Sequence, residues 1–207
     1  MAEARPACRL YLQLPVMPSP KAEEILRQAA GHACCVLLFP HAGQIDETEA
    51  VRLLGLAQER GLACLVKDDA ALAKKIGADG VHINADRAAY LRARALLGED
   101  ATIGVFCGLV RHDAMELAEI GANYVAFGPN LTEVATEGDE RAEILAWWSE
   151  IFVIPCIAWD VSSAEEAAAL ADLGADFVAV PQTLWQEDDA LARVAAIDKV
   201  LRERRAV

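Results

Sequence analysis

The sequence lacks long hydrophobic runs, and no stretch approaches the roughly 18 apolar residues that a membrane-spanning helix needs. Residues 1–10 are polar, with Glu3, Arg5 and Arg9 among them, and they lack the apolar segment of a secretory signal peptide. We therefore expect a cytoplasmic protein with no membrane partner.

Basic residues are scarce, with 19 Lys and Arg against 32 Asp and Glu, which gives a net charge of −13. An acidic surface repels the phosphates of nucleic acids and of anionic lipids. The composition therefore argues against a nucleic-acid partner, although it leaves open a local basic pocket for a small anion.

The sequence also lacks the cysteine spacing typical of zinc sites, since no two of the six cysteines form a Cys-x-x-Cys pair. Five of them lie within or at the ends of apolar, strand-like runs, where cysteine usually acts as a small buried hydrophobe. We expect six free thiols and no zinc site. The six are Cys8, Cys34, Cys35, Cys64, Cys107 and Cys156.

The composition is that of a globular protein, 55% hydrophobic and 25% charged, and one segment recurs. The copies are GADGVHI at 77–83, GANYVAF at 121–127 and GADFVAV at 174–180. Each follows an amphipathic stretch, which predicts a helix ended by glycine, a short turn and a buried strand. The copies begin 44 and 53 residues apart, so each interval has room for two βα units.

Five further apolar runs complete a set of eight strands that alternate with eight helices, which predicts a single (β/α)₈ TIM barrel over residues 1–207. The alternative, an open doubly wound sheet, would need a glycine-rich first turn, and residues 15–20 contain no glycine. The expected strands lie at 9–14, 34–39, 63–66, 80–83, 102–106, 124–127, 155–158 and 177–180, and the expected helices at 21–30, 46–60, 69–76, 87–97, 111–120, 140–151, 163–173 and 188–205.

Chemistry in such barrels lies on the loops that follow the strands, so we expect a small-molecule site at the C-terminal mouth. Lys67, Asp68 and Asp86 follow two neighbouring strands, and two carboxylates with a substrate phosphate could hold Mg²⁺. Alternatively, Asp68 or Asp69 caps the helix at 69–76 and Asp86 caps the helix at 87–97. Both interpretations stay open.

Three more side chains have two interpretations, and one pair has a structural role. His82 lies within a strand and either points into the barrel as a ligand or proton donor, or is a core histidine with satisfied hydrogen bonds. Trp159 and Trp185 lie at or beyond strand ends, where they either form the floor for a flat ligand or only pack. Ser163 with Glu166 three residues later is a capping box, which is a structural role.

Several segments together resemble thiamine phosphate synthase and its thiazole tautomerase relatives. They are RLYLQLP, CLVKDD, AKKIGADGVHI, IGVFC, AEIGANYVAFGP, IPCIAWD and GADFVAV, which span nearly the whole chain. The resemblance implies a transferase that joins a pyrimidine methyl diphosphate to a thiazole phosphate, with pyrophosphate leaving under Mg²⁺ assistance. It also implies that Asp68 is one metal ligand and Lys67 a phosphate contact. Arg87 occupies the position of the second metal carboxylate unless the loop shifts and Asp86 replaces it.

The chain departs from the family pattern at most strand ends. The basic set after the second strand is replaced by Leu37–His41, and the Ser-Thr-His region by Phe106–Gly108. The phosphate-binding Gly-Gly after the seventh strand becomes Trp159-Asp160, and the lysine expected near 135–137 is absent. The remaining candidates for substrate contacts are Lys67, His82, Asn130, Thr132, Trp159 and Asp160.

These departures predict a thiamine phosphate synthase-like barrel with an eroded diphosphate and thiazole-phosphate site, weakly active or inactive in thiamine biosynthesis. Two alternatives stay open. One is an active, divergent synthase, and the other is a different small-molecule enzyme with Asp68, His82 and Asp160 as acid–base groups. A homo-oligomer is compatible with the sequence.

Overall fold

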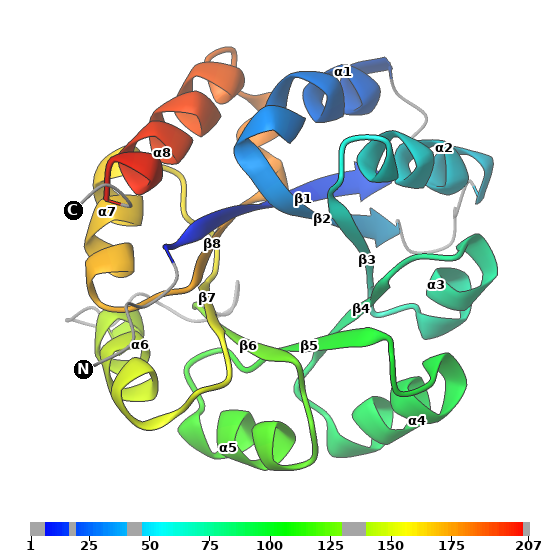
Figure 1. The fold of residues 1–207 in the computed structure, drawn as a ribbon, viewed down its shortest axis with the longest axis vertical. Helices are drawn as coiled ribbons and strands as arrows, with labels where there is room; N and C mark the ends of the chain where they lie inside the picture. Colours follow the sequence, from blue (N-terminus) through cyan, green and yellow to red (C-terminus); the bar gives the residue numbers. More distant parts are fainter. Residues whose placement is uncertain (1–6, 17–19, 41–46, 130–139, 205–207) are drawn as a thin grey trace.

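The computed structural model describes residues 7–16, 20–40, 47–129 and 140–204, which form a closed barrel of eight parallel strands surrounded by helices (Figure 1). Each strand pairs with its neighbours in chain order, and β1 pairs with β8 to close the ring. The predicted TIM barrel is therefore confirmed and the open sheet is excluded. The strands are β1 Arg9–Val16, β2 Ala33–Pro40, β3 Ala63–Lys67, β4 Gly80–Asn84, β5 Thr102–Phe106, β6 Tyr124–Phe127, β7 Cys156–Ala158 and β8 Phe177–Val180.

The helices form the outer ring, and none in the described part of the chain is long and apolar enough to cross a membrane. Two 3₁₀ helices, η1 Ala30–His32 and η2 Gln182–Gln186, were not predicted. η1 directly follows α1, and η2 lies between β8 and α8. The α-helices are α1 Pro20–Ala29, α2 Glu47–Gln58, α3 Ala70–Ile76, α4 Arg87–Leu97, α5 Arg111–Glu119, α6 Glu140–Ile151, α7 Ala164–Asp172 and α8 Ala190–Arg204.

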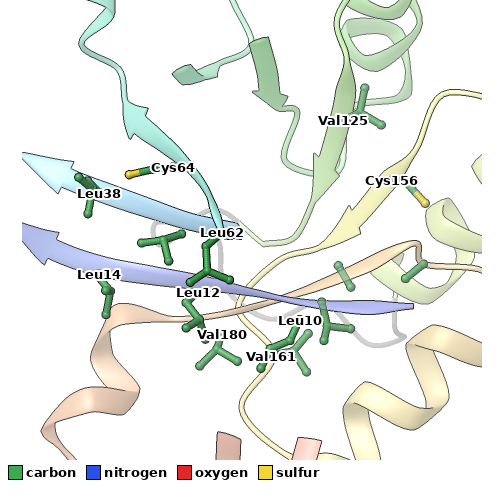
Figure 2. Close-up of a cluster of buried hydrophobic side chains, with 14 of the residues drawn as sticks. Leu10, Leu12, Leu14, Leu38, Leu62, Cys64, Val125, Cys156, Val161 and Val180 are labelled. Atoms are coloured by element: carbon green, nitrogen blue, oxygen red, sulfur yellow. The ribbon is translucent and has the colours of Figure 1, made fainter. Parts of the chain in front are cut away.

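Two layers of apolar side chains arise because successive residues of a strand face opposite sides. Leu10, Leu12 and Leu14 are fully buried in the larger layer, between the strands and the helices (Figure 2). Tyr11, between two of these leucines, belongs to a separate cluster with Trp159, inside the barrel. All six cysteines are free thiols, and Cys8 and Cys34 are the two that are partly exposed.

The glycine of each repeated segment adopts the left-handed conformation that ends a helix. Gly77, Gly121 and Gly174 have φ angles of 77°, 103° and 98°. Residues with a side chain rarely adopt this conformation, which explains why glycine recurs there. The predicted helix–glycine–strand pattern is confirmed in all three copies.

The third residue of each repeat fastens its strand to the preceding one. In each copy a side-chain oxygen accepts the backbone N–H of a residue at the start of the preceding strand, at 2.7 to 2.8 Å. The backbone N–H of the same residue donates back to the carbonyl oxygen of that partner, so each contact is reciprocal. The three pairs are Asp79 with Cys64, Asn123 with Ile103, and Asp176 with Cys156.

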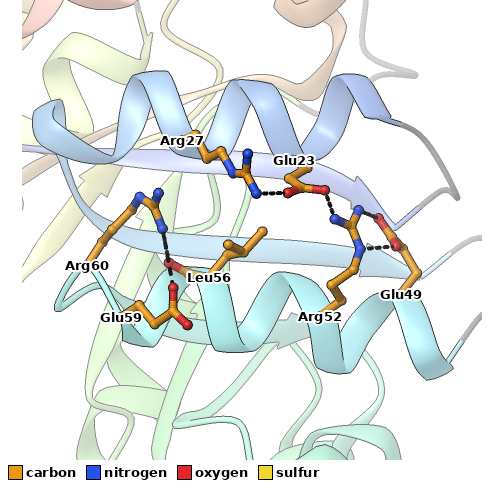
Figure 3. A network of polar contacts seen from close by, with 7 residues as sticks. All are labelled: Glu23, Arg27, Glu49, Arg52, Leu56, Glu59 and Arg60. Carbon is orange, nitrogen blue, oxygen red and sulfur yellow. Dashed lines mark hydrogen bonds and ion pairs between the residues drawn. The ribbon is translucent and has the colours of Figure 1, made fainter.

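Ion pairs join neighbouring helices on the outside of the barrel. Arg52 of α2 contacts Glu23 of α1 and also Glu49 of its own helix, and Glu23 contacts Arg27 in turn (Figure 3). Exposed pairs of this kind contribute at most about 1 kcal/mol each. This network therefore aligns α1 with α2 but adds little to the stability supplied by the buried layers.

Candidate functional site at the barrel mouth

A cavity of about 400 Å³ lies where the strands end, which is where chemistry is expected in this fold. Its walls combine a few polar groups with several aromatic rings and prolines, as is usual for small-molecule sites. The lining residues are Gln13, Phe39, Lys67, Asn84, Phe106, Pro129, Trp159, Asp160, Pro181, Gln182 and Thr183.

The side of the cavity formed by β3 and β4 carries an internal ion pair. The ammonium of Lys67 donates to Asp68 Oδ2 at 2.6 Å and to Asn84 Oδ1 at 2.9 Å. The Asn84 backbone N–H donates to Asp68 Oδ1 at 3.1 Å, so both carboxylate oxygens are engaged. Burial lowers the pKa of Lys67, and the hydrogen bond from its ammonium to Asp68 opposes that shift. Lys67 therefore lines the cavity with its positive charge balanced by the carboxylate of Asp68.

The two residues proposed to hold Mg²⁺, Asp68 and Asp86, both have hydrogen-bond partners within the protein. Asp86 Oδ1 accepts the Ala89 N–H at 2.6 Å and caps α4, and Asp69 caps α3 by accepting the Leu72 N–H at 2.8 Å. Asp68, the other proposed ligand, is already bonded to an ammonium. No three His, Cys, Asp or Glu side chains of the described residues are grouped to hold a metal ion. Asp69 and Asp86 therefore act as helix caps, and Mg²⁺ binding by Asp68 and Asp86 stays a prediction.

Arg87, the cation nearest to the second metal position in the family pattern, pairs elsewhere. Its Nη1 atom lies 3.4 Å from Glu116 Oε1 on α5, and Arg87 does not line the cavity. It is therefore not available to replace a lost phosphate contact.

The opposite side of the cavity, formed by β7 and β1, carries a second carboxylate. Asp160 follows β7, and its Oδ1 atom accepts a hydrogen bond from Gln13 Nε2 at 2.9 Å. Gln13 is only 2% exposed, so this amide is fixed in the barrel wall. Burial raises the pKa of Asp160, and the Gln13 hydrogen bond and the charge of Arg141 oppose that shift.

Trp159 forms the floor of the cavity and covers a buried histidine. The His82 ring stacks on the indole with centroids 4.6 Å apart and 7° between the planes. His82 Nδ1 lies 2.8 Å from the hydroxyl of Tyr124, which lies 3.1 Å from the hydroxyl of Tyr11. Burial and the charge of Lys67 hold the pKa of His82 well below its usual range, so the ring is neutral. The structure thus places His82 beneath the floor, not in the cavity lining.

The aromatic stack depends on a glycine that no motif identified. A Cβ atom at Gly104 would lie 1.9 Å from the ring of Tyr124, so only glycine leaves room for this tyrosine. The sequence analysis also missed Gln13. Its signal was present, because it is a polar residue inside the apolar run RLYLQLP, on the same strand face as Tyr11.

The remaining residues singled out in the sequence have three outcomes. Trp185 is 3% exposed and donates its indole N–H to the Gln13 carbonyl at 2.7 Å, so it packs and does not form a floor. Asn130 and Thr132, together with His41 and the region of the missing lysine, lie outside the described residues. Ser163 accepts the Glu166 N–H at the start of α7, as the capping box predicted.

Comparison with known proteins gives consistent matches along the chain. The family described as thiamine monophosphate synthase matches residues 42–184. Thiamine-phosphate synthases of Erythrobacter litoralis and Rhodospirillum centenum are 36% and 38% identical, over 97% and 94% of this chain and 99% and 98% of those proteins. A solved thiamine phosphate pyrophosphorylase from Pyrococcus furiosus superposes with a TM-score of 0.74 at 20% identity, covering 94% of this chain and 96% of that one. At that identity the structural likeness supports the fold alone.

Proposed function

The chain belongs to the thiamine monophosphate synthase family, and from that premise we propose that its mouth binds one small planar ligand without condensing a pyrimidine diphosphate with a thiazole phosphate. The observation that carries this proposal is the charge of the cavity. Lys67 is the one Lys or Arg among the described lining residues, and Asp68 neutralises it. Asp160 adds a carboxylate on the other side.

Loss of a diphosphate requires positive groups where negative charge develops, and removing one such donor commonly lowers the rate by about 10²–10³. The sequence of the segments 17–19, 41–46 and 130–139 contains no Lys or Arg, whereas 130–139 contains Glu133, Glu137 and Asp139. The segment after β8 begins with Pro181, which has no N–H to offer an anion. The chain therefore has few groups with which to hold two phosphorylated substrates.

A coupled assay with the pyrimidine diphosphate, the thiazole phosphate and Mg²⁺ tests the proposal. We expect thiamine phosphate to form at the background rate, and to form equally slowly with Asp68→Ala and with the exposed control Glu119→Gln. Clear turnover that Asp68→Ala abolishes and Glu119→Gln leaves intact would contradict the proposal. It would mean that the charge clamp had been rebuilt from other residues.

A second candidate is an active, divergent synthase, and the names of the relatives favour it. Two proteins named thiamine-phosphate synthase match more than nine-tenths of the chain. Calorimetric titration with the pyrimidine diphosphate separates the candidates, because an active enzyme must bind this substrate more tightly when Mg²⁺ is present. The first proposal expects no Mg²⁺-dependent binding.

A further inference from the structure

We propose that Asp160, held by Gln13, recognises the amino group of a flat heteroaromatic ligand that carries no phosphate. This inference rests on the proposed function and names the ligand class of the same cavity. It follows from three properties of the β7 and β1 side of the mouth: a fixed acceptor, a carboxylate that forms no ion pair with the described residues, and an aromatic floor.

The acceptor is fixed by the buried side chain of Gln13, and Gln13 is itself held by Trp185. Gln13, which is 2% exposed, donates to Asp160 Oδ1 at 2.9 Å, and its own backbone carbonyl accepts the indole N–H of Trp185 at 2.7 Å. The φ angle of Asp160 is +59°, so the chain turns sharply after β7 and places this side chain at the cavity. A preorganised carboxylate loses little conformational freedom when it binds a ligand.

The charge of Asp160 is not cancelled by the cavity lining on its side. Lys67 is the one cation among the described lining residues, and Trp159, Gln182 and Thr183, which follow β7 and β8, are neutral. Arg141 does not line the cavity: its guanidinium donates to the Trp159 carbonyl at 2.8 Å and pairs with Glu166, and its charge opposes the rise in the pKa of Asp160. An ionised carboxylate accepts hydrogen bonds and donates none, so it attracts N–H groups and repels a phosphate.

The floor selects a flat shape. Trp159 is supported from below by the parallel ring of His82, and Phe106 lies beside it with centroids 5.6 Å apart and 46° between the planes. Phe39 and Pro181 complete the apolar lining. Aromatic side chains arranged in this way bind the faces of planar rings. A cavity of about 400 Å³ has room for a ligand of one or two rings.

Titrations of the full chain with two small probes at pH 7.5, followed by NMR, test the inference. The probes are 4-aminopyrimidine and 4-methylpyrimidine, which have the same shape but differ in the ability to donate N–H. We expect the amino probe to bind about tenfold more tightly, because a hydrogen bond to a charged group discriminates by about that factor. Asp160→Asn should remove most of this preference, whereas Asp100→Asn, the same change on an exposed turn before β5, should leave it intact.

The inference is overturned if neither probe binds, if the two bind equally, or if Asp160→Asn keeps the full preference. It is also overturned if inorganic phosphate displaces the amino probe from the wild-type protein but not from Asp160→Asn. These outcomes are independent of the turnover assay. Formation of thiamine phosphate would contradict the proposed function even if the amino preference is found. Conversely, absence of the amino preference would contradict this inference even if turnover stays at the background rate.

Discussion

Asp68 and Asp160 have the same backbone geometry on opposite sides of the mouth. Each follows a strand, β3 or β7, and these strands lie four positions apart in a ring of eight (Figure 1). Their φ angles are 57° and 59°, and they are the two residues other than glycine with positive φ in the described part of the chain. Asp tolerates this conformation better than most residues, so both turns can place a carboxylate where a strand ends, and Asp160 lines the cavity.

The two aspartates differ in the partners that their side chains receive. Asp68 receives the ammonium of Lys67 and the side chain and backbone of Asn84, which cancels its charge. Asp160 receives only the neutral amide of Gln13 from within the cavity lining. Backbone geometry therefore places a charge at the mouth, but the side chains that contact it decide whether that charge is available to a ligand.

The largest expected effect tests whether the two sides share one floor. Gly104→Ala forces a methyl group into the ring of Tyr124, so we expect the free energy of unfolding to fall by about 3 kcal/mol. Both sides of the mouth should be perturbed, because the stack of Tyr124 and His82 supports Trp159. Chemical denaturation measures the loss. Gly55→Ala in α2 is the control, because no atom lies within 4 Å of the added methyl group.

The next prediction concerns the ion pair of Lys67 and Asp68 on the β3 side, which Asp68→Ala removes. Asp68→Ala leaves the ammonium of Lys67, whose side chain is 13% exposed, without its carboxylate, and we expect a loss of about 1–2 kcal/mol. Lys67→Met combined with Asp68→Ala should recover part of this loss, since no unpaired charge remains. A double variant no more stable than Asp68→Ala would show that the ion pair is not what balances this side.

On the β7 side we expect a small change of opposite sign. Asp160→Asn keeps an acceptor for Gln13 and removes a charge that burial disfavours, so the variant should be more stable than the wild type by about 0.5 kcal/mol at pH 7. The difference should be absent below the usual Asp pKa, where both states of the wild type are protonated, and should grow as pH rises to the raised pKa of Asp160. Denaturation of both proteins from pH 3.5 to 7.5 measures it, and destabilisation at pH 7 would contradict the comparison.

The smallest effect concerns the floor that the two sides share. Burial and the charge of Lys67 lower the pKa of His82, so its ring should stay neutral through the usual histidine range from pH 7.5 to 5.5. Its contribution to stability is complete above the usual pKa and is lost as pH falls toward the lowered one. Two-dimensional ¹H–¹⁵N spectra of the imidazole should show no protonation shift over this range. A normal titration would mean that water reaches His82.

The fold was predictable because its signals are local and repeated. Three copies of one helix–glycine–strand segment fixed the spacing of the βα units, and the apolar runs between them supplied the other strands. The N-caps at Asp69 and Asp86 were also among the predicted alternatives, since capping depends on residues three positions apart. The 3₁₀ helix η2 was missed, because five residues carry too little periodicity to be recognised.

The site was less predictable because its contacts join residues that are far apart in the chain. Gln13 and Asp160 are separated by 147 positions, and the hydroxyls of Tyr11 and Tyr124 by 113. The strand-end rule placed Trp159 and Asp160 correctly at the mouth, but no rule indicates which side chain comes to lie beside them. Trp159 stacks on His82, and Gly104 leaves room for Tyr124. Both contacts join different strands, so they become visible only when the barrel is closed.

The reciprocal contacts made by Asp79, Asn123 and Asp176 divide the barrel into modules. They tie β3 to β4, β5 to β6 and β7 to β8 at the starts of the strands, away from the mouth. The two strands of each module are therefore joined by their own pair of hydrogen bonds at the end opposite to the cavity. Mutation of a mouth loop leaves that fastening intact, so evolution can exchange the ligand-binding residues of one module without rebuilding the scaffold.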